Sequence, residues 1–155
     1  MSTSLQEELK QSKPFASLEV EAYISLVRTE AILSQRVNAL FKAHGITQTL
    51  YNLMRIIRGG PEEGVPCATV GERLITRVPD VTRLVDRAVD QGLVTRNRPE
   101  SDRRVVLLRL TERGDTLLET LRQPLVDLHG EQLGRLPEND LKTLIDLLAR
   151  LREVR

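Results

Sequence analysis

The segment 79–111 constrains the fold most, because it predicts a helix, a two-stranded hairpin and the start of a further helix in direct succession. Apolar residues at helical spacing predict the helix over 79–91. Residues 93–98 and 105–110 are strand-like, and the Pro-Glu-Ser-Asp stretch 99–102 between them has the composition of a turn. A chain with this order is a mixed structure in which the strands are short and the helices dominate.

The rest of the chain reads as helices around this unit. Residues 1–13 are polar and are expected to form a loose tail. Together with the segment 79–111, this predicts one mainly α domain with a small β-hairpin, in the order α-α-α-α-β-β-α-α. The other helices are expected at 18–43, 48–57 and 68–74, in a stretch capped by Thr111, and in a last stretch opened by Pro137. Thr47 is the expected N-cap of the second helix, and Pro79 is expected in the first turn of the fourth.

Composition favours a soluble protein of the cytoplasm. The chain has 155 residues, 40% of them hydrophobic and 29% charged, which is enough for one domain with a core. No apolar run approaches the length of about 20 residues that spans a bilayer. The N-terminus lacks an apolar signal segment, and Cys67, the single cysteine, has no partner for an internal disulfide.

Charge is distributed unevenly although the net charge is only +1. Residues 77–109 contain eight arginines, no lysine and five acidic residues, a net charge of +3, whereas the remainder carries −2. A basic middle within a slightly acidic frame indicates a phosphate-binding surface, although a solvated face would give the same excess.

The fourth predicted helix presents a polar face that fits a DNA groove. Val81, Val85 and Ala88 share the apolar face. In a helix-turn-helix the N-terminal part of the second helix meets base edges, and Arg83 is our candidate for the guanine O6 and N7 acceptors. The DNA-contact candidates of this region are Arg77, Pro79, Asp80, Thr82, Arg83 and Arg87. An ordinary amphipathic surface helix is the alternative.

The predicted hairpin is rich in arginine, which favours a narrow and negative minor groove. The candidate DNA-contact residues of this wing are Arg96, Arg98, Asp102, Arg103 and Arg104. Some of these arginines are instead expected to pair with Glu100 or Asp102, so that one pair stiffens the turn while the others face DNA.

Three segments together resemble the MarR family of bacterial regulators. They are the stretch 80–96, the motif Ser101-Asp-Arg-Arg104 and the motif Leu110-Thr-Glu-Arg-Gly114, with 44–53 similar to the family's entry into its second helix. The resemblance runs from about Val20 onward. Its most specific part is the Asp-Arg-Arg wing a few residues before Leu-Thr-Glu.

The resemblance implies a winged helix-turn-helix and a homodimer that binds double-stranded DNA at a pseudopalindromic operator, most often as a repressor. Arg83 takes the base-contacting position, Arg104 the wing-tip position in the minor groove, and Asp102 the position that orients Arg104. The resemblance also implies a small aromatic or anionic ligand, and His44, Tyr51 and Arg55 are the candidate pocket residues; placement on a helix surface is the alternative for them.

Dimerisation is assigned to the two ends of the chain. The chain is read as a single unit 1–155, with dimerisation helices at 14–43 and 115–155 and a DNA-binding lobe at 46–114. Both ends carry more apolar residues than a small lobe can bury, among them Leu18, Val20, Val27, Leu147 and Leu151. Such patches mark an interface, and a two-fold dimer is the default.

Two departures from the family pattern concern the turn before the fourth helix. Ile75 stands where the family often has glycine, and an isoleucine resists the left-handed backbone, so we expect a differently built turn. Arg77 and Val78 replace the usual Ser or Thr cap, which leaves Thr76 as the candidate cap.

Other functional classes fit the sequence less well. We find no phosphate-binding loop with its Lys, no nucleophile with a base signature and too few His and Cys residues for zinc, so we expect no enzyme, cofactor or metal site. Cys67 is expected to be a buried inert thiol rather than a peroxide sensor. A winged helix that binds only proteins remains the alternative function, which Asp86 and Asp90 support.

Overall fold

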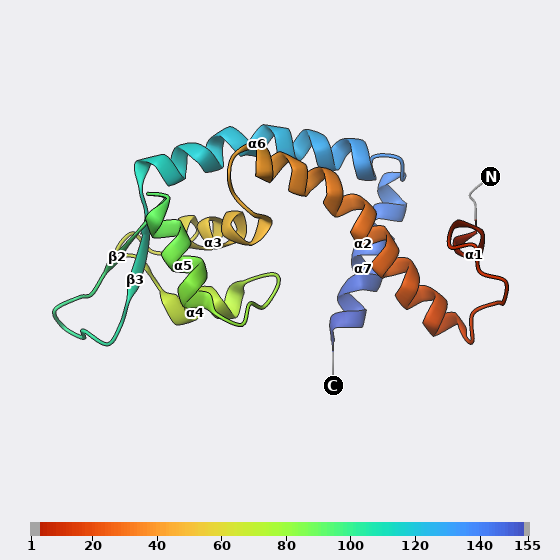
Figure 1. The fold of residues 1–155 in the computed structure, drawn as a ribbon, viewed down its shortest axis with the longest axis horizontal. Coiled ribbons are helices and arrows are strands. Elements are labelled where there is room, and N and C mark those ends of the chain that lie inside the picture. Colours follow the sequence, from red (N-terminus) through yellow and green to blue (C-terminus); the bar gives the residue numbers. More distant parts are fainter. Residues whose placement is uncertain (1–3, 154–155) are drawn as a thin grey trace. The chain divides into compact units, whose positions relative to one another are not determined.

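A computed structural model describes residues 4–153, and the chain divides into two compact units, one up to Leu40 and one from Phe41 onward (Figure 1). The first unit holds α1 (Leu5–Glu8) and most of α2 (Leu18–Ala43). The expected loose tail is therefore partly helical. Ser4 and Glu7 form a capping box at the start of α1, in which each side chain accepts a hydrogen bond from the other residue's backbone N–H.

The core of the second unit is built on α3 (Gln48–Arg58). Thr47 caps this helix as predicted, because its hydroxyl accepts from the N–H of Leu50 at 3.2 Å. Five residues of α3 are buried: Leu50, Leu53, Met54, Ile56 and Ile57. Their removal from water is the main stabilising contribution to this part of the fold.

A three-stranded antiparallel sheet lies beside α3, in the order β1-β3-β2. Strands β2 (Val94–Asn97) and β3 (Leu107–Leu110) form the predicted hairpin, with Val94 paired to Leu110 and Asn97 to Leu107. Strand β1 (Val65–Pro66) pairs with Leu108 and Leu107 and was not predicted. Strand β3 is also shorter than the predicted strand 105–110, since residues 105 and 106 lie outside it.

Helices α4 (Cys67–Arg73) and α5 (Val81–Asp90) form the helix-turn-helix pair. They approach closely at Gly71, where an added Cβ would lie 3.0 Å from Val81 Cγ2. Two predictions for this region are wrong: Pro79 does not lie in the first turn of α5, and Thr76 is not its N-cap. Asp80 is the N-cap, because its carboxylate satisfies the N–H of Arg83 at 3.0 Å and so lets the helix begin at Val81.

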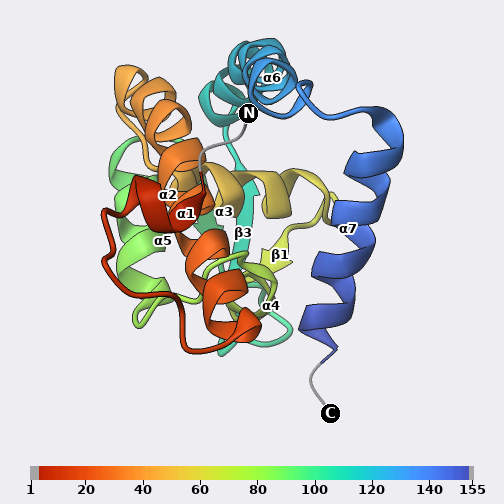
Figure 2. The ribbon, with the colours of Figure 1, turned by 90° about the vertical axis from the view of Figure 1, so that its right-hand side faces the viewer.

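The hairpin is followed at once by α6 (Glu112–Leu133), and α7 (Glu138–Arg152) completes the described chain. Thr111 caps α6 as predicted, accepting from the N–H of Gly114 at 3.0 Å. Gly114 lies so close to the end of α5 that an added Cβ would be 2.2 Å from the carbonyl oxygen of Leu93. In Figure 2, α7 descends from the end of α6 and stands apart from α3 and the sheet.

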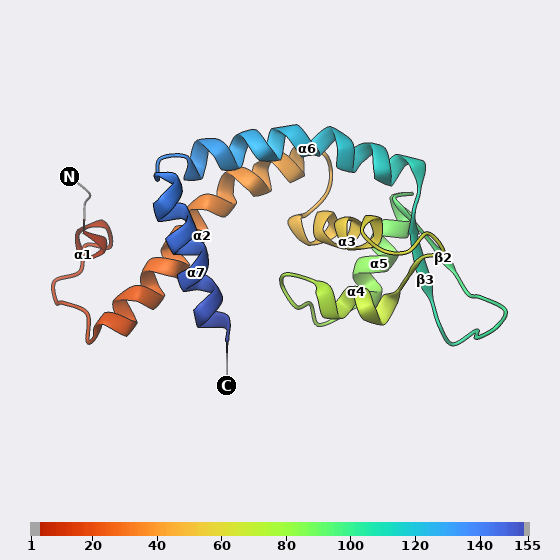
Figure 3. The same cartoon turned by 180° about the vertical axis from the view of Figure 1, so that it is seen from behind.

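The second unit has one edge that carries three features together. The loop between α4 and α5, the N-terminal end of α5 and the tip of the β2–β3 hairpin all reach the lower edge in Figures 1 and 3, while α6 runs along the opposite edge. The mainly helical fold with a small wing is thus confirmed, with a third strand added. Within residues 4–153, no helix is long and apolar enough to cross a membrane.

Candidate nucleic-acid interface

Helix α5 buries one face and exposes its arginines on the other. Val85 and Ala88 are fully buried, whereas Thr82, Arg83 and Arg87 are exposed. The hydrogen bond between Asp80 and the N–H of Arg83 fixes the first turn, and with it the place from which the Arg83 side chain leaves the helix. The exposed guanidinium can offer two parallel donors to a planar pair of acceptors.

Arg77 and Pro79 lie in the loop before α5 rather than on the helix, and both are exposed. The loop was expected to be built without a left-handed residue at Ile75, and this is confirmed, since among residues 4–153 only Lys10 is a non-glycine with positive φ. Instead, the side chain of Asn52 on α3 holds the loop, because its Oδ1 accepts from the N–H of Ile75 at 2.8 Å. Sequence reasoning missed Asn52, and a lone polar residue on a helix gives no signal of this kind.

The loop of the hairpin is ordered by Asp102. Its Oδ1 accepts from the backbone N–H of Arg104 at 3.0 Å and from Arg104 Nε at 3.2 Å. These hydrogen bonds, the side-chain bond first, lower the pKa of the Asp102 carboxyl. The Arg104 side chain nevertheless remains 91% exposed, so most of its guanidinium donors are available to a ligand.

Arg96 on β2 forms an ion pair with Asp86 on α5, between its Nη2 and the Asp86 Oδ1. This pair joins the hairpin to the recognition helix through side chains that are 36% and 48% exposed. Neutralising Asp86 removes one of the two acidic charges that weighed against a phosphate-binding face. The role of Asp86 was not predicted, because it lies on the polar face of the helix with no sequence signal for its partner.

Arg98 and Arg103 are exposed in the hairpin region, and the described residues give neither of them a hydrogen bond or ion pair. The wing therefore holds one arginine tied to α5, one oriented by an aspartate and two that reach into solvent. A mixture of paired and free arginines was expected, although Arg96 pairs with Asp86 on α5 rather than with an acidic residue of the turn. The arrangement supplies several cations along one edge of the unit, as phosphate contacts require.

Cys67 begins α4 and is half-buried rather than buried as expected. Burial raises the pKa of the Cys67 thiol, and the positive charge of Arg96 opposes this with a smaller effect. A raised pKa keeps the thiol protonated near neutral pH, and a protonated thiol is a poor nucleophile.

The three candidate ligand residues lie around the start of the second unit. His44 follows α2, while Tyr51 and Arg55 are one turn apart on α3. Tyr51 is half-buried and packs on Phe41, with ring centroids 4.9 Å apart, and Arg55 is exposed. Their part in ligand binding stays a prediction.

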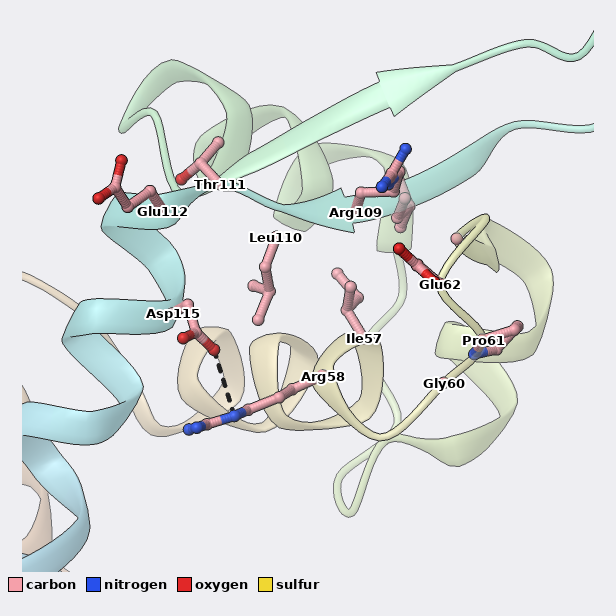
Figure 4. Close-up of a pocket in the computed structure, with 12 residues that line it drawn as sticks. Ile57, Arg58, Gly60, Pro61, Glu62, Arg109, Leu110, Thr111, Glu112 and Asp115 are labelled. Atoms are coloured by element: carbon pink, nitrogen blue, oxygen red, sulfur yellow. Dashed lines mark ion pairs between the residues drawn. The ribbon is translucent and has the colours of Figure 1, made fainter.

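A hollow of about 320 Å³ lies at the other end of α3, between the loop 59–64, β3 and the start of α6 (Figure 4). None of the three candidate ligand residues lines it. On one wall Arg58 points toward Asp115, with Nε 3.2 Å from Oδ1, and also reaches Glu119. Within the described chain, no three His, Cys, Asp or Glu side chains gather as a metal site would need.

The helix-turn-helix, the arginine-bearing recognition helix and the wing together define a winged helix-turn-helix protein of the DNA-binding class. No protein-family model matches the chain. The solved MarR transcription factor from Planctomyces limnophilus is 38% identical, with 88% of this chain and 98% of that one covered and a TM-score of 0.68. An uncharacterised HTH-type transcriptional regulator of Bacillus subtilis, YdgJ, is 25% identical over 89% of this chain and 81% of its own length.

Two further solved structures share the fold at lower identity. The MepR–DNA complex from S. aureus has a TM-score of 0.74 at 18% identity, covering 83% of this chain and 95% of that one. The PcaV regulator from Streptomyces coelicolor, solved with its natural ligand, has a TM-score of 0.73 at 22% identity, covering 92% and 97%. The chain belongs to the MarR family of winged helix-turn-helix transcriptional regulators, which are DNA-binding proteins and not enzymes.

Proposed function

We propose that this regulator acts as a homodimeric repressor that binds a pseudopalindromic operator, with α5 in the major groove and the β2–β3 wing in the minor groove. The observation that carries the proposal is the shared edge of the second unit, which both the capped start of α5 and the hairpin tip reach (Figure 1). On this edge Arg83 reads guanine, because its fork matches the O6 and N7 acceptors. Thr82, Arg77, Pro79 and Arg87 surround it.

The wing supplies affinity and groove-width preference. Arg104, oriented by Asp102, enters the minor groove, and Arg98 and Arg103 contact the flanking phosphates. Asp80 acts through the start of α5, since its carboxylate already accepts the N–H of Arg83. The ion pair between Arg96 on β2 and Asp86 on α5 holds the wing in place beside the recognition helix.

Homodimerisation is proposed through the segments 14–43 and 115–155, with 46–114 as the DNA-binding lobe. Helix α7 has no buried residue in the single chain, and Ile145, Leu147 and Leu151 are 65%, 47% and 68% exposed. Leu18 and Val27 of α2 are 80% and 51% exposed. Apolar surface of this extent is covered in a stable protein, and a second copy is the self-complementary solution.

A small aromatic or anionic ligand is proposed to modulate binding through His44, Tyr51 and Arg55. The ring of Tyr51 packs on Phe41 at a tilt of 35°, and the Arg55 guanidinium one turn away can hold a carboxylate. The relative PcaV was solved with its natural ligand, which supports ligand control in proteins of this fold. Benzoate is a suitable probe, and Arg55→Gln is expected to weaken its effect on DNA binding while leaving DNA affinity without benzoate unchanged.

Selection from random duplex DNA tests the proposed operator. The expected result is a motif with two inverted half-sites whose centres are about 10 base pairs apart, as two symmetric recognition helices require. Static light scattering in parallel is expected to give twice the mass of 17.5 kDa. The variant Ile145→Glu/Leu151→Glu is expected to be monomeric and to lose most of its operator affinity.

Two outcomes would contradict the proposal. Enrichment of no motif, with equal binding to all duplexes, would leave a nonspecific DNA-binding protein. Absence of binding to any duplex at low salt would favour the protein-interaction function instead.

A further inference from the structure

We propose that Ile75, in the turn between α4 and α5, is a specificity-determining residue that contacts the C5 methyl group of a thymine in the major groove. The inference rests on the proposed function of this edge as the operator-binding surface. It assigns a second kind of base contact to that edge, an apolar one, beside the hydrogen bonds expected from Arg83.

The exposure of Ile75 is the first observation. Its side chain is 80% exposed, and it is the one large hydrophobic residue of 46–114, all of which the structure describes, that is largely exposed. The other largely exposed apolar residues lie in α2, in α6 and α7, or in the turn between those two helices. Single exposed apolar residues are common, so exposure alone does not identify a contact.

The location of Ile75 is the second observation. The loop 74–80 reaches the same edge as the N-terminal end of α5 and the wing tip (Figures 1 and 3). Arg73 and Arg77 flank Ile75 two positions away on either side, and both are exposed. A partner that lies against this edge therefore meets exposed cations and an exposed apolar side chain next to one another. The major groove of DNA matches both at thymine, where an apolar methyl group lies between the negatively charged phosphates.

The fixed backbone of Ile75 is the third observation. Asn52 Oδ1 accepts from the N–H of Ile75 at 2.8 Å, which ties the turn to α3, the most buried helix of the unit. A side chain on a tethered turn loses less conformational freedom on binding than one on a free loop. Asn52 is therefore a positioning residue for this contact.

The chemistry fits thymine more closely than any other base. In the major groove, adenine, guanine and cytosine offer hydrogen-bonding groups, whereas thymine adds a methyl group. A branched aliphatic side chain has no donor or acceptor, so it gains from the methyl and gains little elsewhere. The contact would prefer thymine over cytosine at one position of each half-site.

Deoxyuridine substitution tests the inference, because deoxyuridine differs from thymidine only by lacking that methyl. In the selected operator each thymine is replaced in turn, and dissociation constants are measured for the wild type and for Ile75→Ala. The wild type is expected to lose about fourfold in affinity per methyl removed at one thymine of each half-site, the amount that one buried methyl group contributes. Ile75→Ala is expected to show no loss there.

Three control variants separate the contact from other effects. Ile75→Val keeps an apolar branch and is expected to keep the methyl dependence. Asn52→Leu is expected to reduce the methyl dependence, whereas Asn52→Asp, which keeps an oxygen acceptor, is expected to retain it.

The inference is overturned if Ile75→Ala keeps the wild-type loss at every thymine, or if the wild type is insensitive to deoxyuridine throughout its operator. These results leave the proposed function intact, because the operator is still bound. A wild type that binds no selected duplex overturns the proposed function, and the role of Ile75 with it.

Discussion

Asp102 Oδ1 accepts two hydrogen bonds from Arg104, one from its backbone N–H at 3.0 Å and one from Nε at 3.2 Å. The same carboxylate thus sets the path of the loop and the direction of the guanidinium. Because the Arg104 side chain stays 91% exposed, the pair orients the arginine without covering it. An exposed pair of this kind contributes little to stability, so its value lies in the geometry it gives the wing.

Asp102→Ala distinguishes positioning from charge. The substitution removes a negative charge next to the proposed minor-groove contact, so electrostatics alone predicts tighter DNA binding. Positioning predicts the opposite, because Arg104 loses the acceptor that orients it. We expect weaker binding in a fluorescence anisotropy titration at constant salt. Tighter binding would show that Asp102 acts only as a charge.

The lowered pKa of Asp102 gives a pH prediction. A carboxyl with a lowered pKa is stabilised in its charged form, so the pair with Arg104 is complete above the ordinary Asp range and is lost as pH falls through the lowered value. In a carboxyl-carbon NMR titration, Arg104→Ala is expected to return the Asp102 midpoint toward its ordinary value. Arg103→Ala is the matched control and is expected to leave the midpoint low. Equal midpoints in wild type and Arg104→Ala would contradict the pair.

Arg104→Ala itself tests the wing on DNA. We expect weaker binding to specific and nonspecific duplexes alike, and a salt slope of log K smaller in magnitude by about 1, as loss of one phosphate-neutralising cation gives. Arg113→Ala, which changes an exposed arginine in the first turn of α6, is the control and is expected to change neither. A wild-type salt slope in Arg104→Ala would remove the wing from the interface.

Arg83→Ala addresses base reading. The substitution is expected to cost about 1–3 kcal/mol in operator binding and to relax preference at one base pair. Arg83→Lys keeps the charge but loses the two-pronged geometry, so it is expected to lose the base preference as Arg83→Ala does. Repeated selection with each variant measures both effects. An unchanged motif in Arg83→Ala would contradict the assignment.

A substitution at Gly114 tests how closely the start of α6 packs against Leu93, in the segment between α5 and β2. An added Cβ would lie 2.2 Å from the Leu93 carbonyl oxygen, so Gly114→Ala is expected to lower the free energy of unfolding by about 1–3 kcal/mol. Gly130 lies in the same helix with nothing within 4 Å of an added Cβ, and Gly130→Ala is expected to be neutral or to raise it by up to about 1 kcal/mol. Urea unfolding of both variants measures the difference. Equal effects would contradict the close approach.

The Asp80 and Ile75 region shows where sequence reasoning reached its limit. Helical spacing, Thr47 and Thr111 predicted their elements well, because these signals are local. The start of α5 was misplaced, since the preference of Pro79 for a first turn competed with the stronger carboxylate cap of Asp80. The hydrogen bond from Ile75 to Asn52 spans 23 residues and leaves no mark in a local pattern.

The missed strand has a similar cause. Val65–Pro66 is too short to show alternation, and its proline argues against a strand when only the sequence is considered. Val65–Pro66 nevertheless forms a strand by pairing with Leu108 and Leu107, because an edge strand can accommodate a proline where no N–H is needed. The pair of Asp86 with Arg96 was likewise invisible, although each residue was noted for its charge.

Competition binding on operator-bearing DNA measures whether the edge with α5 and the wing distinguishes one DNA sequence from another. Wild type and Arg83→Ala are titrated in mobility shifts against the selected operator, with excess unrelated duplex, at two salt concentrations. We expect the wild-type complex to survive the competitor and to weaken steeply with salt, while Arg83→Ala keeps the salt dependence but loses resistance to the competitor. A wild-type complex that unrelated duplex displaces as readily as the operator itself would contradict the claim that this edge reads sequence.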